Sequence, residues 1–343
     1  MKKECISHLD FPETIPFCTL NYGSLDLEHI VSSKFNNTAG VLAIHKGKVV
    51  LEQYFGNHNV DDTFHVASVT KSIISALIGI AIHKGYIKSI DEKVMNFFPE
   101  YNDLLNNECR QSITLKHLLT MTAPYDFPDW NEPFDKFCSS PHWSEYILNN
   151  LGKNGNPGDF KYSTQGAHLL SCIITRATHK SAREFANEYL FSPLCMNIIP
   201  DYKPRAYDFD YLFGKDLKAW PHDPDGNSTG GWGLNLTLRD MALFGFLYMN
   251  EGFYNDKQIV QKSWIRASTS PFSDKNVFLE NKYGYLWWIS HYGNLYSYSA
   301  VGDGGNIISC IPEKELVIAV SAENPIPIEN PYEFIQNYVI PYV

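Results

Sequence analysis

The stretch FHVASVTKSIISALIGIAIHKG, from Phe64 to Gly85, joins a short polar segment to a long apolar one. After Ser68 the large apolar residues recur every three or four positions, which predicts a buried helix that ends near Gly85. Ser68 and Lys71 stand three residues apart at the start of this helix. Residues at this spacing lie about 60° apart around the axis with roughly 4.5 Å of rise. Their side chains can therefore touch.

This pair has the chemistry of an activated nucleophile. A serine hydroxyl attacks well only when a base removes its proton, and a nearby amine can do so if its pKa falls. Lowering a lysine pKa from about 10.4 to near 7 requires roughly 4 kcal/mol, which desolvation and the positive potential of a helix N-terminus can supply. The same N-terminus offers free backbone N–H groups to an oxyanion. The alternative is that Ser68 caps the helix and Lys71 is an ordinary solvated residue.

The composition excludes several classes of protein. The chain has 343 residues, of which 44% are hydrophobic, and a net charge of −10, with no basic cluster beyond Lys2 and Lys3. Such a chain can bury a large core but has no electrostatic footprint for nucleic acid. No apolar run reaches the length of a membrane span, and the N-terminus lacks the apolar core of a signal peptide. We therefore expect a cytoplasmic protein without a membrane segment. The alternative is a protein from which a leader has been removed.

Neither the cysteines nor the acidic residues follow a metal-binding pattern. Asp223, Asp225 and Asn227 resemble the start of a calcium loop, but Ser228 and Leu234 stand where that loop needs glycine and glutamate. The sequence therefore predicts no metal and no cofactor. The seven cysteines are dispersed, which is typical of free thiols in a reducing compartment. They are Cys5, Cys18, Cys109, Cys138, Cys172, Cys195 and Cys310.

The elements expected along the chain indicate an α+β organisation. Residues 39–56 predict two strands around the turn HKGK. Helices and loops follow, and after a connection rich in proline, aspartate and glycine the tail carries one helix and several strand-like segments. Strands at both ends of the chain predict a sheet assembled from both termini, within residues 1–88 and 230–343. A mostly helical domain of residues 89–229 would pack beside it.

A second serine competes with Ser68 for the role of nucleophile. GNSTG, from Gly226 to Gly230, matches the G-x-S-x-G pattern around Ser228. A nucleophile elbow needs a buried strand before the serine and a helix after it, and the flanking segments KAWPHDPD and GGWGLNL provide neither. A polar loop is the better interpretation. A histidine base would need a motif that positions it, and none of the candidates has one: His65, His117, His142, His168, His222 and His291.

Two later segments could complete a site with Ser68 and Lys71. Tyr162, in GDFKYSTQGAHLL, stands at a turn before a predicted helix. Beside a cation its phenol could exchange a proton with the serine, although the tyrosine could equally be an aromatic contact at the helix start. In AVGDGGNIIS, glycines between two strand-like runs allow the close approach of a ligand or another backbone. A hairpin turn would use them as well.

Taken in order, ASVTKS, FKYSTQGAHLL and VGDGGN resemble the three signature motifs of the serine beta-lactamase and D,D-peptidase superfamily. The resemblance spans roughly residues 40–325. It is to the class C-like branch, which includes penicillin-binding-protein-like esterases and 6-aminohexanoate-dimer hydrolases. It implies an antiparallel sheet flanked by helices, a mostly helical second domain, and a site between the two. The activity that it implies is hydrolysis through an acyl-enzyme.

The resemblance also implies a role for each motif residue. Ser68 would be acylated, Lys71 would be its proton partner, and Tyr162 would act as base in the attack and as acid for the leaving group. The backbone N–H groups of Ser68 and Asn306 would form the oxyanion hole. The further substrate-binding positions would be Thr164, Asp303, Gly304 and Gly305.

Two residues depart from the family pattern. Thr164 stands where the second motif usually has asparagine, and Asp303 stands where beta-lactamases carry a lysine or histidine. A carboxylate at that position would repel the carboxylate of beta-lactams and peptidoglycan peptides. The sequence therefore favours a hydrolase of small esters or linear amides. A beta-lactamase or D,D-peptidase, and a non-catalytic binding module on the same scaffold, remain the alternatives.

Overall fold

Seven strands form one antiparallel sheet that joins the two ends of the chain. The computed structural model describes residues 9, 11, 26–128, 130–214, 216–277, 280–324 and 330–343. The strand order in the sheet is β2-β1-β11-β10-β9-β8-β7. Its strands are β1 (Thr38–His45), β2 (Lys48–Tyr54), β7 (Lys282–Tyr283), β8 (Trp288–Tyr292), β9 (Leu295–Gly302), β10 (Asn306–Ile311) and β11 (Leu316–Ala322). Two smaller pairs are β3 (Thr63–His65) with β4 (Asn235–Thr237), and β5 (Phe253–Tyr254) with β6 (Lys257–Gln258).

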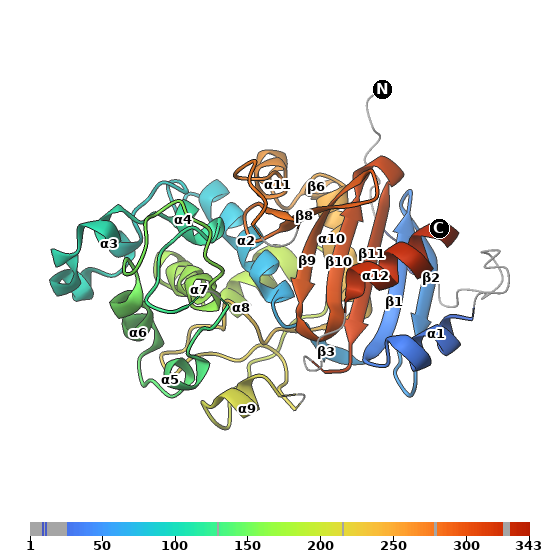
Figure 1. Cartoon of the computed structure of the whole chain (residues 1–343), viewed down its shortest axis with the longest axis horizontal. Coiled ribbons are helices and arrows are strands. Elements are labelled where there is room, and N and C mark those ends of the chain that lie inside the picture. Colours follow the sequence, from blue (N-terminus) through green and yellow to red (C-terminus); the bar gives the residue numbers. More distant parts are fainter. Residues whose placement is uncertain are drawn as a thin grey trace.

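The sheet is buried on both faces because its central strands are apolar on both. In β1, Val41 and Ala43 join one buried cluster, whereas Leu42 and Ile44 join another. Since successive side chains of a strand point to opposite faces, the two clusters lie on the two sides of the sheet. The first cluster includes residues of α1 (Leu27–Lys34) and α12 (Pro331–Phe334), and the second includes α10 (Leu238–Met249) and α2 (Val69–His83). Figure 1 shows α1 and α12 in front of the sheet and α10 behind it.

The remaining helices form a second body beside the sheet, with α2 between the two (Figure 1). Residues 69–81 of α2 are all buried, as expected for a helix that is apolar around its whole circumference. The other helices are α3 (Glu108–Ser112), α4 (Leu115–Leu119), α5 (Phe134–Cys138), α6 (Trp143–Asn150), α7 (Thr164–Thr178), α8 (Ala182–Ala186), α9 (Phe209–Leu212) and α11 (Lys262–Ser268). Shorter 3₁₀ or π turns are η1 (Val94–Phe97), η2 (Pro99–Asn106), η3 (Asn187–Phe191), η4 (Asp303–Gly305), η5 (Pro312–Lys314), η6 (Ile335–Val339) and η7 (Ile340–Tyr342).

The predicted α+β fold class is confirmed, with strands at both ends of the chain and helices between them. The strands predicted within 39–56 are β1 and β2, and the helix predicted after Ser68 is α2. The domain bounds of 1–88 with 230–343, and of 89–229, stay a prediction. Within the described residues, no helix combines the length and the apolar character needed to span a membrane. The five described cysteines form no disulfide with one another, and Cys5 and Cys18 lie outside the described residues.

Candidate active site

Ser68 lies where the chain turns into α2. Ala67 before it has a left-handed backbone with φ of 47°, which costs a non-glycine residue roughly 1–2 kcal/mol. The N–H of Ala67 donates to Nδ1 of His65 at 3.1 Å, which holds this turn. Ser68 occupies the N-cap position, but its hydroxyl accepts no hydrogen bond from a backbone N–H of the helix. The capping interpretation is therefore wrong, and the hydroxyl faces other partners.

Lys71 is buried one turn into α2, with 1% of its surface exposed. Its Nζ donates to Oγ of Ser68 at 2.8 Å and to the carbonyl oxygen of Gly231 at 2.7 Å. Burial lowers the pKa of Lys71 to about 8, although the nearby carboxylates of Glu132 and Asp303 favour its charged form. The pKa of Lys71 is thus lowered in the direction that the sequence argument requires of a base.

Tyr162 lies beside the same pair of residues. Its ring stacks between Trp130 and Trp288, with centroid distances of 5.1 and 5.9 Å, and Nζ of Lys71 lies 4.9 Å from its centroid. Burial raises the pKa of Tyr162 well above its usual range, and a hydrogen bond with Ser68 only partly opposes this. The phenol therefore keeps its proton at neutral pH. Tyr162 could act as a base only if cations lowered this pKa, and the structure has the opposite balance.

The third predicted segment approaches Ser68 through Gly302, the last residue of β9. A Cβ atom at Gly302 would lie 2.3 Å from the carbonyl oxygen of Val66 and 3.0 Å from the backbone nitrogen of Ser68. A side chain at this position would separate the strand from the helix start. Glycine is therefore required here so that β9 can pass directly beside the nucleophile candidate.

The residues that follow Gly302 are placed differently from the sequence prediction. Asp303 lines the site, whereas Gly304, Gly305 and Asn306 are not among the described residues that line it. The Asn306 side chain is fully buried and donates to the carbonyl oxygens of Asp303 at 2.8 Å and His65 at 3.3 Å. Asn306 pairs with Gly302 across the hairpin.

A cavity of about 630 Å³ opens in front of Ser68. Thr164, at the start of α7, also lines it, as predicted from the second motif. Among the described residues, the only charged side chains that line the cavity are those of Glu132 and Asp303, both acidic. Partial desolvation raises the pKa of Asp303, and Lys71 opposes the rise. The aromatic residues that line the cavity include Trp130, Phe134, Phe213, Trp232, Trp288 and Tyr332.

Glu132 is a site residue that sequence reasoning missed. Its carboxylate accepts from the backbone N–H groups of Thr164 at 2.8 Å and Gln165 at 3.1 Å, and from the hydroxyl of Ser163 at 2.9 Å. Burial raises the pKa of Glu132, while these hydrogen bonds and the charge of Lys71 oppose the rise. The carboxylate thus caps the first turn of α7 from another segment. No capping signal within α7 points to it, because the acceptor stands some thirty residues earlier in the chain.

We expect Glu132→Gln to lower the free energy of unfolding by about 1–2 kcal/mol. The amide has one acceptor oxygen in place of two, so one donor at the start of α7 loses its partner. Chemical denaturation measures the change. Glu145→Gln is the matched control, because Glu145 is exposed in the first turn of α6, and it should stay within about 0.5 kcal/mol of the wild type. Equal effects of the two changes would contradict the capping role.

The competing candidates lie away from the cavity. Ser228 is 2% exposed, and its hydroxyl accepts from the N–H of Arg183 at 3.0 Å. Asn227 donates to Asp223 twice at 2.8 Å, from its backbone and from its side chain. None of the six candidate histidines is among the described residues that line the cavity. The structure therefore brings together Ser68, Lys71 and Tyr162, and none of their rivals joins them.

The chain is similar in sequence and in fold to known proteins. The beta-lactamase family model matches residues 30–330. The 6-aminohexanoate-dimer hydrolase of Paenarthrobacter ureafaciens is 23% identical over 84% of this chain and 74% of that protein. A Bacillus anthracis structure proposed to be a 6-aminohexanoate-dimer hydrolase superposes with a TM-score of 0.74 and 21% identity, over 98% of this chain and 86% of that one. The octameric penicillin-binding protein homologue of Pyrococcus abyssi gives a TM-score of 0.65 and 21% identity, over 92% and 76% of the two chains.

The family model covers most of the chain, including the segments that carry Ser68, Tyr162 and Gly302. Members of this family are generally serine hydrolases. The chain belongs to the beta-lactamase family.

Proposed function

We propose that this protein is a serine hydrolase that acts through an acyl-enzyme on small esters or linear amides. One observation carries the proposal: the buried Nζ of Lys71 lies 2.8 Å from Oγ of Ser68, and its pKa is lowered to about 8. A lysine in this state can take the serine proton at neutral pH. The family membership and the likeness to 6-aminohexanoate-dimer hydrolases support the same reaction class.

In the proposed mechanism, Lys71 is the base and Tyr162 is the acid. Neutral Lys71 accepts the proton of Ser68 as Oγ attacks the carbonyl carbon of the substrate. Tyr162, whose raised pKa keeps the phenol protonated, gives its proton to the leaving group and recovers one from Lys71. Water then attacks the ester formed at Ser68 and passes a proton to neutral Lys71, which returns it to Oγ as the acid leaves.

For the oxyanion hole we propose the backbone N–H groups of Ser68 and Asp303. Ser68 stands at a helix start, where backbone N–H groups lack partners within the helix. Asp303 follows Gly302, whose Cα lies close to the backbone nitrogen of Ser68. Asp303 also lines the cavity, whereas Asn306, the donor expected from the family resemblance, is buried behind the turn. Two such donors are a usual means of stabilising a tetrahedral intermediate.

The lining of the cavity supports neutral substrates with an apolar acyl group. Aromatic rings form much of its wall, and Glu132 and Asp303 are its charged side chains among the described residues. A substrate carboxylate would meet these two acids, with Lys71 as the compensating cation behind Ser68. Like charges at short range cost free energy even at a high effective dielectric constant. We therefore expect the enzyme to prefer neutral esters and amides as substrates over beta-lactams and D-alanyl peptides, which carry a carboxylate.

We expect Asp303→Lys to raise the ratio of kcat/KM for a penicillin to that for a neutral ester by about tenfold or more. The change replaces a repulsive charge by an attractive one and leaves the backbone N–H in place. Steady-state kinetics with benzylpenicillin and p-nitrophenyl butyrate measure the ratio. Asp303→Asn, which only removes the charge, should give an intermediate value. An unchanged ratio in both variants would mean that the Asp303 side chain does not face the substrate.

Covalent labelling tests the proposed function directly. The protein is treated with a fluorophosphonate, digested and examined by mass spectrometry. We expect an adduct on the peptide that contains Ser68. An adduct on Ser228 would support the competing serine, and the absence of any adduct would support a non-catalytic binding module. A panel of p-nitrophenyl esters, nitrocefin, D-Ala-D-Ala peptides and 6-aminohexanoate dimer then orders the substrates.

A further inference from the structure

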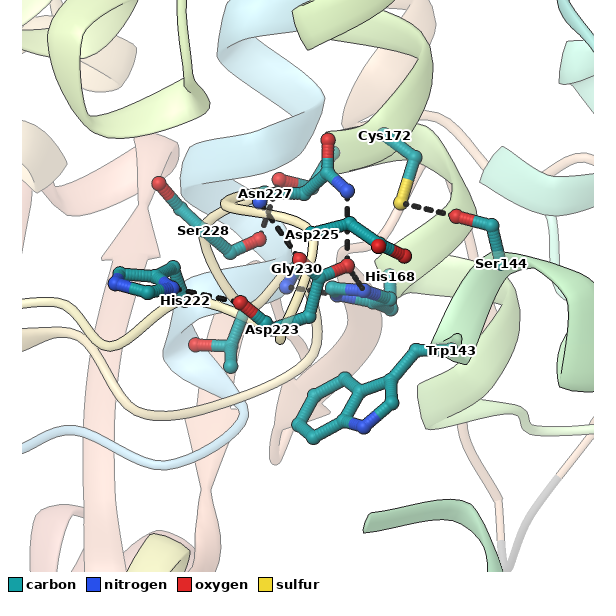
Figure 2. Close-up of polar contacts among 12 residues, drawn as sticks. Trp143, Ser144, His168, Cys172, His222, Asp223, Asp225, Asn227, Ser228 and Gly230 are labelled. Carbon is teal, nitrogen blue, oxygen red and sulfur yellow. Dashed lines mark hydrogen bonds and ion pairs between the residues drawn. The ribbon is translucent and has the colours of Figure 1, made fainter. Parts of the chain in front are cut away.

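A buried polar cluster lies behind the cavity, where α7 meets the loop of residues 221–233. His168 and Asp223 are both fully buried, and Nε2 of the ring lies 3.0 Å from Oδ2 of the carboxylate. On the other side of the ring, Nδ1 of His168 accepts from the backbone N–H of Gly230 at 3.2 Å. Figure 2 shows the imidazole between Asp223 and the backbone of this loop. No motif in the sequence points to this histidine, and the proposed reaction does not use it directly.

The hydrogen bonds define the protonation state of the ring. Burial opposes a charge on His168, whereas Cys172 and Asp223 favour one, and the hydrogen bond at Nδ1 decides between the two forms. The only nitrogen that could take a second proton is Nδ1, and the N–H of Gly230 already points at it. A donor at that distance requires a lone pair on Nδ1. We therefore treat His168 as the neutral ring, whose proton on Nε2 is donated to Asp223.

A metal ion is the first alternative for this cluster. His168, Cys172 and Asp223 each offer a ligand atom, and these atoms lie within 4.8 Å of one another. A ligating histidine usually donates its other ring N–H to an acceptor, but Nδ1 of His168 faces a donor instead. A metal on Nε2 would leave both ring nitrogens without a proton. Cys172 already accepts from the hydroxyl of Ser144 at 3.4 Å (Figure 2). The hydrogen-bond pattern therefore disfavours a metal site.

The cluster is instead connected to Lys71 through the backbone of two consecutive glycines. Gly230 is held by His168, and the carbonyl oxygen of the next residue, Gly231, accepts from Nζ of Lys71 at 2.7 Å. A Cβ atom at Gly230 would lie 2.3 Å from the carbonyl oxygen of Ala167, so this backbone rests directly on α7. The imidazole thus sets the position of the peptide segment that supplies one of the two hydrogen-bond acceptors of Lys71.

Other residues of the loop also form hydrogen bonds on the side that faces His168. Asp223 accepts from both the backbone and the side chain of Asn227 at 2.8 Å. These hydrogen bonds, together with that from His168, keep the pKa of Asp223 below its usual range despite the opposing cost of burial. The carbonyl oxygen of Ser228 accepts from the hydroxyl of Ser171 on α7 at 2.6 Å. The loop is therefore held to α7 at Asp223 and at Ser228, both of which precede Gly230 in the chain.

We propose that His168 and Asp223 are positioning residues that hold the carbonyl oxygen of Gly231 against Lys71. The carbonyl favours the charged form of the lysine and fixes its Nζ beside Ser68. If the acceptor at Gly230 is lost, this carbonyl shifts, the ammonium form loses a partner, and the pKa of Lys71 falls. The functional consequence rests on the proposed function, in which Lys71 is the base. The position and the pKa of Lys71 can be measured without any turnover.

Two substitutions at His168 separate the positioning role from a general loss of stability. An asparagine places its oxygen near the former Nδ1 and can still accept from Gly230, whereas a glutamine reaches toward Asp223 and leaves the N–H of Gly230 without an acceptor. Both remove a buried ring, so both should lower the melting temperature. We expect His168→Gln to lower kcat about tenfold or more and to lower the pKa of Lys71 by about half a unit or more. His168→Asn should change either quantity much less.

The pKa of Lys71 is followed by NMR of protein labelled with ¹³C at lysine Cε, with the signal assigned by its loss in Lys71→Arg. The titratable groups that face Lys71 are Glu132, Asp303 and Tyr162, and none of them is changed. His117→Gln is the control for a structural histidine, because His117 forms a capping box at α4 with Thr114. It should leave the pKa of Lys71 and kcat at their wild-type values.

Equal effects of His168→Gln and His168→Asn on the pKa of Lys71 would overturn the proposal, and so would wild-type values in His168→Gln. If His168→Gln does not fold, Asp223→Asn takes its place, since it keeps the volume and weakens the hold on the ring. Unchanged kcat and an unchanged pKa of Lys71 in that variant would overturn the proposal as well. Failure of the wild type to form an adduct at Ser68 refutes the proposed function alone, because the lysine titration still judges the positioning role.

Discussion

Ser68→Ala is expected to lower kcat/KM for every ester and amide by about 10³-fold or more. The change removes the atom that forms the acyl-enzyme, and no other hydroxyl in the site has a lysine at hydrogen-bond distance among the described residues. The fold should be preserved. Because the hydroxyl of Ser68 does not cap α2, its loss should cost less than the about 1 kcal/mol of a true cap. Ester hydrolysis and chemical denaturation measure the two quantities.

Ser228→Ala is the matched control for this result. Ser228 is buried and accepts from the N–H of Arg183, so its replacement should reduce stability somewhat and leave hydrolysis close to the wild-type rate. Retention of more than a small fraction of esterase activity by Ser68→Ala would show that Ser68 is not the nucleophile. Loss of activity only in Ser228→Ala would transfer that role to the competing serine.

Lys71→Arg and Tyr162→Phe should each lower the rate of acylation by about 10²–10⁴-fold. Arginine keeps the positive charge but cannot give up its proton at the pH of the assay, so it cannot serve as the base. Phenylalanine keeps the ring stacked between Trp130 and Trp288 but removes the proton that the leaving group needs. Burst kinetics with p-nitrophenyl esters measure acylation separately from release of the acid.

The pH profile distinguishes this site from one that uses a histidine. Lys71 must be neutral to accept the proton of Ser68, and it is protonated below its pKa. Since burial lowers that pKa to about 8, kcat/KM should rise as the pH increases toward 8 and level off above it. A histidine base would place the same limb near its ordinary pKa of about 6.5. If Tyr162→Phe keeps a near wild-type rate, and kcat/KM still rises over the same pH range, then Tyr162 has no part in the mechanism.

The local elements could be predicted from the sequence, because they depend on neighbouring residues. The apolar spacing after Ser68 defines α2, and the three-residue spacing of Ser68 and Lys71 brings their side chains to 2.8 Å. The apolar segments of the tail define strands of the central sheet. Periodicity and helical geometry act over one or two turns. The first half of the site is therefore encoded within a single short segment.

The rest of the site depends on contacts between segments far apart in the chain. Gly231, the second partner of Lys71, is 160 residues away from it in sequence, and Glu132 reaches α7 from a separate loop. The sequence predicts an oxyanion donor at Asn306, whereas Asp303, and not Asn306, is among the described residues that line the cavity.

The pKa values of the site also depend partly on the local sequence and partly on the tertiary structure. The sequence argument expected the pKa of Lys71 to fall, and it does, because α2 itself is apolar around the lysine. A role of Tyr162 as a base would need its pKa to fall as well, but burial raises it. Desolvation is a property of the folded chain, since it depends on every segment that excludes water from a group. The sequence alone therefore determined which residues could react, and the tertiary structure decided which of them holds the proton.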